Sequence, residues 1–268
     1  MSIIDFENLE ERLPALRDSY CSAAPFRHVI VDEFCDSVAL SSALDSFVYD
    51  WTQRERKSRD YIFAKNKFET PQLEEISEEM KLLKDELLSS RFQRIVQEIT
   101  CEDIFIDPTF HGGGLHRGGE GSFLDMHVDF NYHPSNETWF RNVNLLLYLN
   151  RNWHPDWGGE LKLQHLHYPE REPIEIAPVF NRLVIMETRD FTLHGYDTIR
   201  FPSGEFRTSV AAYGYSLNHS NDASPRTTTW YPNNSGYFKK ILGRVTPYIV
   251  HLKAKVLGSG TSRNASRK

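Results

Sequence analysis

The residues best suited to chemistry are His127 and Asp129, in the stretch S-F-L-D-M-H-V-D-F-N over 122–131. Its apolar residues predict a β-strand, and successive side chains of a strand alternate between its two faces. His127 and Asp129 therefore point the same way, and one imidazole and one carboxylate can bind a single metal ion. A His-x-Asp pair is common by chance, so the prediction depends on a third ligand.

His194 is the candidate for that ligand. It lies in the segment F-T-L-H-G (191–195), which follows the apolar strand predicted over 181–187, and Gly195 beside it leaves room for an ion. It lies 65 positions after Asp129, which is far enough for a partner strand of the same sheet. Two histidines and one carboxylate form the facial triad of non-haem Fe(II) oxygenases. Zinc hydrolases also use this ligand set, so the triad alone leaves the reaction open.

Arg207 and Ser209 narrow the choice of chemistry. They share one face of the strand predicted over 206–216, thirteen and fifteen positions after His194. A guanidinium binds a carboxylate through two hydrogen bonds and stays charged at all relevant pH values. Alone, Arg207 reads equally as a surface residue of an edge strand. Together with the triad, it predicts a keto-dicarboxylic acid bound to iron at one end and to Arg207 at the other.

Several motifs resemble the prolyl 4-hydroxylase-type 2-oxoglutarate- and Fe(II)-dependent oxygenases, most closely a bacterial branch that modifies small molecules or glycans. These motifs are G-G-G-L-H (112–116), H-V-D-F-N (127–131), N-L-L-L-Y-L-N (144–150), W-G-G-E-L-K-L (157–163), F-N-R-L-V-I-M-E-T (180–188), H-G-Y (194–196) and R-T-S-V-A-A-Y-G-Y (207–215). The resemblance implies a double-stranded β-helix, with Fe(II), 2-oxoglutarate and O₂ as cofactor and cosubstrates.

The resemblance also implies roles for individual residues. His127, Asp129 and His194 would carry iron, and Arg207 would hold 2-oxoglutarate. Others are assigned to the cosubstrate or the pocket beside it: Ser209, Tyr148, Asn144, His116 and, on the substrate side, Asn131. Tyr148 reads equally as a core aromatic residue. The segment Gly195-Tyr196-Asp197 departs from the Gly-His-Pro usual in that branch, which concerns the substrate rather than the triad.

The expected reaction is hydroxylation of an unactivated C–H bond of a small molecule or sugar, with release of succinate and CO₂. Halogenating relatives lack the carboxylate ligand, so Asp129 favours hydroxylation, while desaturation and ring formation stay open. Two alternatives are a peptidyl prolyl 4-hydroxylase and a non-catalytic, zinc-binding cupin-like module. The candidate substrate residues are aromatic or basic: Arg117, Trp139, Arg141 and Tyr196.

The elements that must position these residues fall into two classes. Helical spacing predicts helices from Asp36 to Phe47, from Thr70-Pro71 to Leu87 and over 92–101, after a short helical or irregular lead-in and a strand over 25–34. From Ile104 the pattern changes to short strands separated by Gly, Pro and Asn, which indicates a jelly-roll or cupin-like core. The fold class expected is mainly β with N-terminal helices (α+β). Residues 1–103 pack on a core over 104–217, and 218–268 form a basic extension with a disordered end, all in one domain.

The distribution of charge limits which classes of partner are expected. Nine basic residues and no Asp or Glu follow Asp222, so the first 222 residues hold 22 basic and 37 acidic residues. Their net charge of −15 disfavours nucleic acid as a partner. No apolar run approaches 18 residues and the first twenty carry acids, which predicts a cytoplasmic protein without a transmembrane segment. Cys21, Cys35 and Cys101 are expected to be buried thiols rather than disulfides or zinc ligands. The oligomeric state stays open.

Overall fold

The computed structural model describes residues 2–47, 56–57, 62–217 and 224–232. Its strands are β1 (His28–Asp32), β2 (Arg56–Lys57), β3 (Ala64–Thr70), β4 (Phe105–Ile106), β5 (Gly114–Val128), β6 (Tyr132–His133), β7 (Asn136–Tyr148), β8 (Leu161–His165), β9 (Ile174–Ile176), β10 (Arg182–Glu187), β11 (Thr192–Tyr196), β12 (Arg207–Leu217) and β13 (Thr229–Trp230). Its helices are α1 (Phe6–Ser22), α2 (Ser37–Asp45), α4 (Glu78–Leu87) and α5 (Ser90–Thr100), with 3₁₀ turns η1 (Leu73–Glu75) and η2 (Pro155–Trp157).

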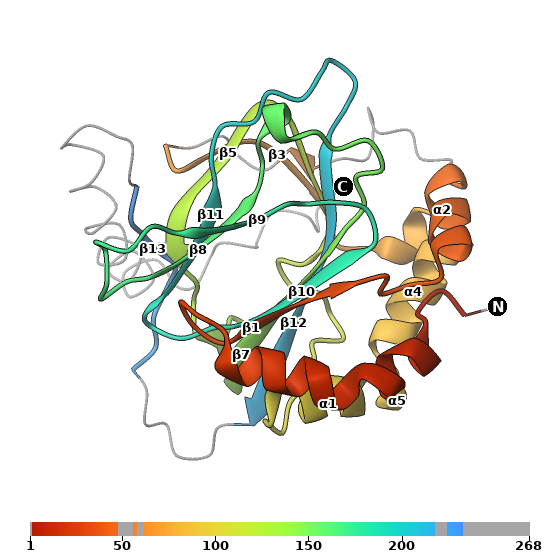
Figure 1. The fold of residues 1–268 in the computed structure, drawn as a ribbon, viewed down its shortest axis with the longest axis horizontal. Helices are drawn as coiled ribbons and strands as arrows, with labels where there is room; N and C mark the ends of the chain where they lie inside the picture. The colour runs from red at the N-terminus through yellow and green to blue at the C-terminus, as the bar shows by residue number, and fades with distance from the viewer. Residues whose placement is uncertain (1, 48–55, 58–61, 218–223, 233–268) are drawn as a thin grey trace, which may run out of the picture.

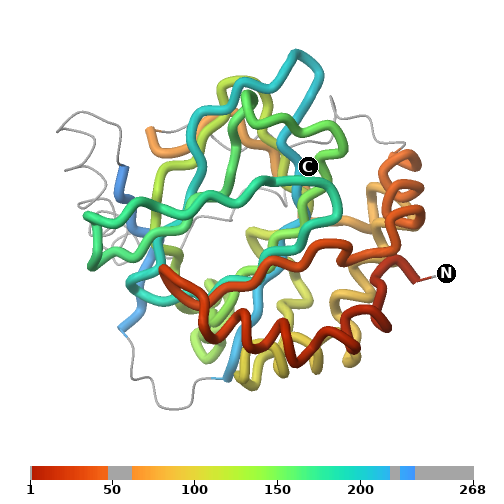
Figure 2. Tube along the Cα trace, in the orientation of Figure 1, coloured from red at the N-terminus to blue at the C-terminus, as the bar shows by residue number. Residues whose placement is uncertain are grey.

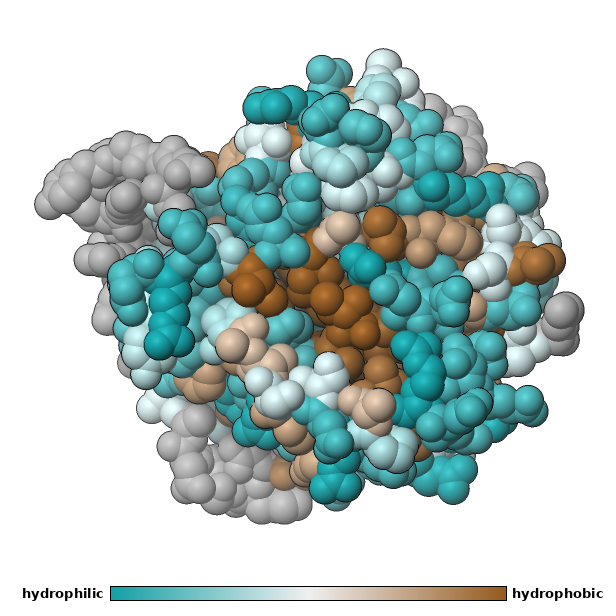
Figure 3. All heavy atoms as spheres, viewed as in Figure 1, coloured by the Kyte–Doolittle hydropathy of each residue, from teal (hydrophilic) through white to brown (hydrophobic). Residues whose placement is uncertain are grey.

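The strands form one antiparallel sheet in the order β1-β10-β7-β12-β5-β11-β8-β9, which curls on itself. Side chains of β8 and β9 pack against side chains of β7 and β10 in one buried cluster, so the two ends of the sheet face each other across the interior. Apolar atoms lie at the centre of the face in Figure 3, ringed by hydrophilic side chains. This is the double-stranded β-helix expected from the sequence, with the helices gathered along one side (Figure 1).

Strand β5 belongs to both halves of the core. Residues 114–118 pair with β12, whereas His127 and Leu124 pair with β11. Between these stretches Gly121 has a φ of +73°, a conformation that side chains with a Cβ rarely adopt. In sequence, the stretches 113–116 and 122–129 indicate two short strands, because glycines separate them. In the structure they form one bent strand, which brings residues from both stretches to one interior.

Alternation along the central strands separates the helix-covered core from the interior that holds the site. On β7, Leu145 and Leu147 join the cluster under the helices, while Leu146 and Tyr148 face the other way, against residues of β8 and β10. The same alternation places Ala212 of β12 under the helices. Polar residues at the alternate positions are thereby directed into the interior.

The helices cover one face of the sheet with apolar stripes at helical spacing. Leu9, Leu13, Leu16 and Tyr20 are the buried residues of α1, and α5 buries a similar stripe. Helices α1 and α5 lie side by side in both ribbon and tube views (Figures 1 and 2). The lead-in expected over the first 24 residues is thus a regular helix of 17 residues.

One predicted helix start is confirmed, and two other predictions change. The side chain of Asp36 caps α2 as expected. The helix predicted to open at Thr70 instead begins at Glu78, because Ser77 accepts from the backbone N–H of Met80 and forms the N-cap. Thr70 ends strand β3. The segment over 54–67 is basic and poorly periodic in sequence, which favours an irregular structure. Its described part nevertheless supplies most of β3, which pairs with β5.

Other expectations are corrected or fall outside the described residues. Cys35 is buried, but Cys21 and Cys101 are exposed, because they lie at the ends of α1 and α5 rather than on their buried faces. Most of the basic extension predicted over 218–268, including the end predicted to be disordered, lies outside the described residues. No helix in the described part of the chain has the length and apolar composition needed to cross a bilayer.

Candidate metal centre

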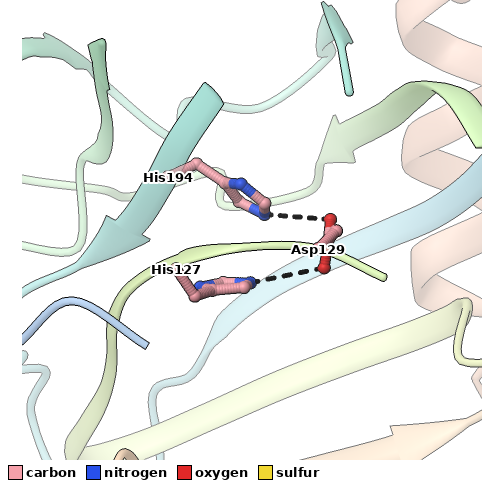
Figure 4. Close-up of side chains that lie close together, drawn as sticks. All are labelled: His127, Asp129 and His194. Carbon is pink, nitrogen blue, oxygen red and sulfur yellow. Dashed lines mark ion pairs between the residues drawn. The ribbon is translucent and has the colours of Figure 1, made fainter. Parts of the chain in front are cut away.

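Strands β5 and β11 bring the predicted triad together. His127 lies opposite His194 in the antiparallel register, and Asp129 directly follows the end of β5. One donor atom from each of the three residues can be chosen so that all lie within 4.8 Å of one another. His127 Nε2 is 3.5 Å from Asp129 Oδ1, and His194 Nε2 is 3.4 Å from Asp129 Oδ2 (Figure 4). Two imidazole nitrogens and a carboxylate are the donor set that non-haem Fe(II) prefers, so these residues fit the ion.

The two imidazoles are held in a state that suits a metal ligand. His127 Nδ1 lies 2.9 Å from the backbone carbonyl of Asp125, which can only accept, so Nδ1 donates to it and Nε2 is the nitrogen directed at Asp129. Burial and the neighbouring His127 lower the pKa of His194 to about 3, so His194 is neutral. A ligating histidine commonly donates its other N–H to a carbonyl in this way.

Asp129 is fixed by two polar side chains from β7. Asn144 Nδ2 donates to Asp129 Oδ2 at 2.9 Å, and Arg141 Nη2 lies 3.0 Å from the same oxygen. Arg141 Nε also donates to Asn144 Oδ1 at 2.8 Å, which closes the triangle. Burial would raise the pKa of Asp129, but Arg141 and then His194 outweigh it and hold that pKa well below its usual range. The carboxylate is therefore ionised and oriented.

A segment from beyond β12 completes the surroundings of the triad. β13 pairs with the end of β5, which sets the Trp230 ring 4.8 Å from the His127 imidazole. Trp230 in turn stacks on Phe63 at 5.2 Å with nearly parallel planes. Arg226 donates from Nε and Nη2 to the backbone carbonyl of Asp129. The imidazole and the backbone of the triad thus depend on contacts with this segment.

Arg207 occupies a buried position at another part of the same interior. Its Nε donates to the Gly159 carbonyl at 2.6 Å, and its Nη2 donates to the Tyr148 hydroxyl at 3.2 Å. Its guanidinium lies 4.2 Å from the centre of the Tyr196 ring. A Cβ on Gly159, whose φ is +89°, would approach Arg207 Cδ to 3.0 Å, so glycine there admits the arginine. These contacts orient the fork of the guanidinium.

One cavity of about 300 Å³ joins the triad to Arg207. Most of the predicted site residues line it: His127, Asp129, His194, Arg207, Ser209, Asn144, His116, Arg117, Arg141 and Tyr196. Tyr148 is fully buried behind the guanidinium of Arg207. Apolar side chains such as Leu146 and Leu161 fill the lining between the polar groups.

Two predicted substrate residues lie elsewhere among the described residues. Trp139 packs against Phe105 at 4.9 Å in a separate aromatic cluster, because it lies near the start of β7. Asn131 donates to the carbonyl of Ser224 and accepts from the N–H of Arg226, so it ties down the segment that leads to β13. Neither belongs to the cavity lining.

The lining residues that the sequence interpretation missed include Lys67, Glu69 and Trp230. Lys67 and Glu69 come from β3, in a segment that its basic residues made look irregular. Trp230 comes from the polar region after Asn218, where β13 is only two residues long and shows no periodicity. The local sequence signal for β3 is Phe68 in F-E-T-P (68–71), an aromatic residue typical of strands that lies just before the predicted helix start at Thr70.

Comparison with known proteins bears on the whole core. Residues 113–215 match the sequence profile of the 2OG-Fe(II) oxygenase superfamily, and this range contains the whole triad and Arg207. Comparison with curated protein sequences gives no significant match.

Solved structures show the same fold at low sequence identity. A prolyl hydroxylase in complex with a hypoxia inducible factor peptide, from Trichoplax adhaerens, is 17% identical with a TM-score of 0.58, covering 78% of this chain and 91% of that one. A Pseudomonas putida prolyl-4-hydroxylase is 15% identical with a TM-score of 0.53, covering 78% and 100%. SnoN, a non-heme alpha ketoglutarate dependent epimerase from nogalamycin biosynthesis, is 11% identical with a TM-score of 0.51, covering 86% and 89%.

These neighbours differ in substrate, so their likeness establishes the fold alone. The family match confirms the predicted cofactor and cosubstrate, Fe(II) and 2-oxoglutarate, which the His-Asp-His site fits. Over residues 113–215 this chain thus matches the 2OG-Fe(II) oxygenase superfamily, and its fold is the double-stranded β-helix of its structural neighbours.

Proposed function

We propose that this protein is a 2-oxoglutarate- and Fe(II)-dependent dioxygenase that hydroxylates an unactivated C–H bond of a small molecule. The observation that carries the proposal is the cavity in which the His127–Asp129–His194 triad and the oriented Arg207 face one another. In the balanced reaction, 2-oxoglutarate, O₂ and R–H give succinate, CO₂ and R–OH. One atom of O₂ enters succinate and the other enters the product.

His127, Asp129 and His194 would hold the ion on one face, leaving the opposite coordination positions toward the cavity. When bound, iron and 2-oxoglutarate supply the oxidising power, and the protein supplies geometry and a shielded site. Asn144 and Arg141 engage Asp129 Oδ2, which restricts how that carboxylate can turn. Trp230 covers one face of the His127 ring and limits access of water there.

Arg207 would bind the carboxylate of 2-oxoglutarate that lies farthest from iron. Its Nε and one Nη2 contact are already engaged by Gly159 and Tyr148, so the remaining N–H groups have a set direction. Ser209 shares the face of Arg207 on β12 and also lines the cavity, where its hydroxyl can donate to the same carboxylate. A permanently charged fork in a buried site suits this dianion.

The size of the cavity favours a small substrate. About 300 Å³ is at the lower end of the range for small-molecule pockets, which is about 300–1,000 Å³. The alternative, peptidyl prolyl hydroxylation, needs an open groove along which an extended chain can lie. The fold neighbours include prolyl hydroxylases, and the test therefore includes proline-containing peptides.

The test measures succinate from purified protein given Fe(II), 2-oxoglutarate and O₂, alone, with a pooled metabolite extract, or with proline-containing peptides. We expect slow succinate formation without the extract and faster formation with it, and a weak visible absorption band for the anaerobic Fe(II)–2-oxoglutarate mixture. His127→Ala should abolish both signals, whereas His154→Ala, at an exposed histidine, should change neither.

Absence of the band and of succinate after aeration would remove the proposal. If the protein also contains stoichiometric zinc after purification without added metal, the absence of both signals would support the zinc-binding alternative. Stimulation by proline peptides alone, with a 16 Da gain on the peptide, would support prolyl hydroxylation.

A further inference from the structure

Strand β3 contributes two opposite charges to the wall of the cavity. In the register with β5, Lys67 lies opposite Gly118 and Glu69 lies opposite His116. Lys67 and Glu69 are two positions apart on one strand, so both point to the same face, and both line the cavity. The assignments made for iron and 2-oxoglutarate leave both without a role.

The two residues form a close ion pair in a partly dehydrated place. Lys67 Nζ is 2.8 Å from Glu69 Oε1, and the side chains are 18% and 35% exposed. Burial would raise the pKa of Glu69, but Lys67 and the neighbouring His116 lower it to about 2. Burial would lower the pKa of Lys67, and Glu69 outweighs it, so that pKa is raised. Both groups are therefore charged at neutral pH.

The pair is separated from the Arg207 position by a residue without a side chain. Gly118 pairs with Lys67 on one side and with Arg207 on the other. A Cβ at Gly118 would come within 2.7 Å of Ser122 Oγ and 3.3 Å of the Tyr196 hydroxyl. The Ser122 and Tyr196 hydroxyls thus fill the space over Gly118 between the two positions. Lys67 and Glu69 form a second charged position in the lining of the same cavity, distinct from the one assigned to the cosubstrate.

A Lys–Glu pair selects for a ligand with both charges. A monoanion would be attracted by Lys67 but repelled by Glu69, and a monocation would be attracted by Glu69 but repelled by Lys67. A neutral sugar has no charge to pair with either residue, so it would leave the ion pair as it is and gain no charged contact. A ligand with an ammonium and a carboxylate on neighbouring atoms can pair with each group, so no charge in the dehydrated wall loses its counter-charge.

We propose that the substrate is a small zwitterion of the α-amino acid type, bound through its carboxylate by Lys67 and through its ammonium by Glu69. This inference rests on the proposed function of the site, because it assigns the triad and Arg207 to iron and 2-oxoglutarate. The side chain of the amino acid would extend along the cavity toward the triad. Residues inside a polypeptide carry neither head-group charge, so a free amino acid is favoured over a protein substrate.

Binding is tested first, without turnover. The probes are the free proteinogenic L-amino acids and a set of D-, β- and γ-amino acids, added to the Zn(II)–2-oxoglutarate protein and followed by saturation-transfer NMR. We expect at least one zwitterion to bind, and its N-acetyl and carboxamide derivatives to bind about tenfold or more weakly, since each loses a charged contact.

Variants then connect binding to the ion pair. Lys67→Met and Glu69→Gln should each weaken the bound zwitterion about tenfold or more. The double variant Lys67→Met/Glu69→Leu removes both charges together, which buried pairs tolerate, so it keeps the fold while losing the zwitterion. Lys65→Met is the matched control, because Lys65 is an exposed lysine of the same strand outside the cavity lining.

The same variants separate this inference from the proposed function. Substrate-independent succinate formation should keep its 2-oxoglutarate KM in the double variant. A KM that rises about tenfold there would assign Lys67 to the cosubstrate and overturn the inference while leaving the oxygenase standing. Binding of neutral sugars or monoanions but of no zwitterion, or unchanged zwitterion binding by the double variant, would also overturn it. If the wild-type protein neither binds metal nor forms succinate, the result would instead count against the proposed function.

Discussion

At the scale of single residues, the candidate metal centre depends on how Asp129 is held. Its Oδ2 accepts a hydrogen bond from Asn144 and pairs with the Arg141 guanidinium. Arg141 is itself buried, and its guanidinium carbon lies 3.6 Å from the centre of the Tyr213 ring. Burying a guanidinium is costly unless its hydrogen bonds and counter-charge are supplied. Here the aspartate supplies the charge and Asn144 supplies an acceptor. The same contacts therefore orient the Asp129 carboxylate and stabilise the buried Arg141.

Asn144→Ala should weaken metal binding. The substitution removes the donor to Asp129 and the acceptor for Arg141, so the carboxylate can rotate. Loss of such a supporting contact typically costs about 10–100-fold in metal affinity, which calorimetric titration with Mn²⁺ would measure. Asn142→Ala is the matched control, because Asn142 contacts Glu102 and Ser216 instead. Equal losses in both variants would contradict the role given to Asn144.

Arg207→Met should raise the KM for 2-oxoglutarate while leaving Mn²⁺ affinity unchanged. The charged hydrogen bonds that it removes are each worth about 1.5–3 kcal/mol, so the increase should be about tenfold or more. Arg207→Lys should recover only part of the loss, because an ammonium cannot form the two parallel bonds of a guanidinium. Normal turnover by Arg207→Met at low 2-oxoglutarate would show that the carboxylate binds elsewhere.

At the scale of elements, the sequence predicted best where alternation and apolar character coincide. The strand later seen as β7 placed Asn144 and Tyr148 on one face, and the structure directs both away from the helices. Prediction failed for β3, whose charged residues face a cavity and so hide the apolar alternation of a strand. It failed for β13, because two residues carry no period. Such elements become strands through pairing with β5, which only the fold can show.

Trp230→Ala should weaken both the fold and the metal site. Trp230 is 6% exposed, stacks on Phe63 and packs against the His127 ring at 4.8 Å. Removing a buried aromatic residue typically costs about 3–5 kcal/mol. Thermal unfolding and Mn²⁺ titration would measure the two effects. Trp139→Ala should lower the Tm without changing Mn²⁺ affinity, since Trp139 packs in a separate cluster. A Trp230→Ala variant with unchanged Mn²⁺ affinity would restrict Trp230 to a packing role.

At the scale of the whole molecule, the buried charges make stability depend on pH. Burial and the nearby Lys67 lower the pKa of His116 to about 3, against about 6.5 in an unfolded chain. Between these values the unfolded chain binds a proton that the folded protein does not. Stability therefore falls as the pH drops from 6.5 toward 3, by at most about 1.4 kcal/mol per pH unit from this group.

His116→Asn should remove that contribution from the metal-free protein. Urea unfolding at pH 6.5 and pH 5 should show a smaller loss of unfolding free energy in the variant, by at most about 2 kcal/mol. His154→Asn is the control, because an exposed histidine is solvated in both states and should leave the loss unchanged. Equal pH dependence of the wild type and His116→Asn would contradict the assignment.

The contacts of Arg226 and Trp230 with the triad have a consequence for how the molecule is made. A ribosome releases the chain from its N-terminus, and domains fold as they emerge. His127, Asp129 and His194 leave the ribosome well before Trp230, so a newly made chain presents three ligands with one side of the His127 ring still uncovered. We therefore expect stable metal binding only after this late segment has packed against the end of β5.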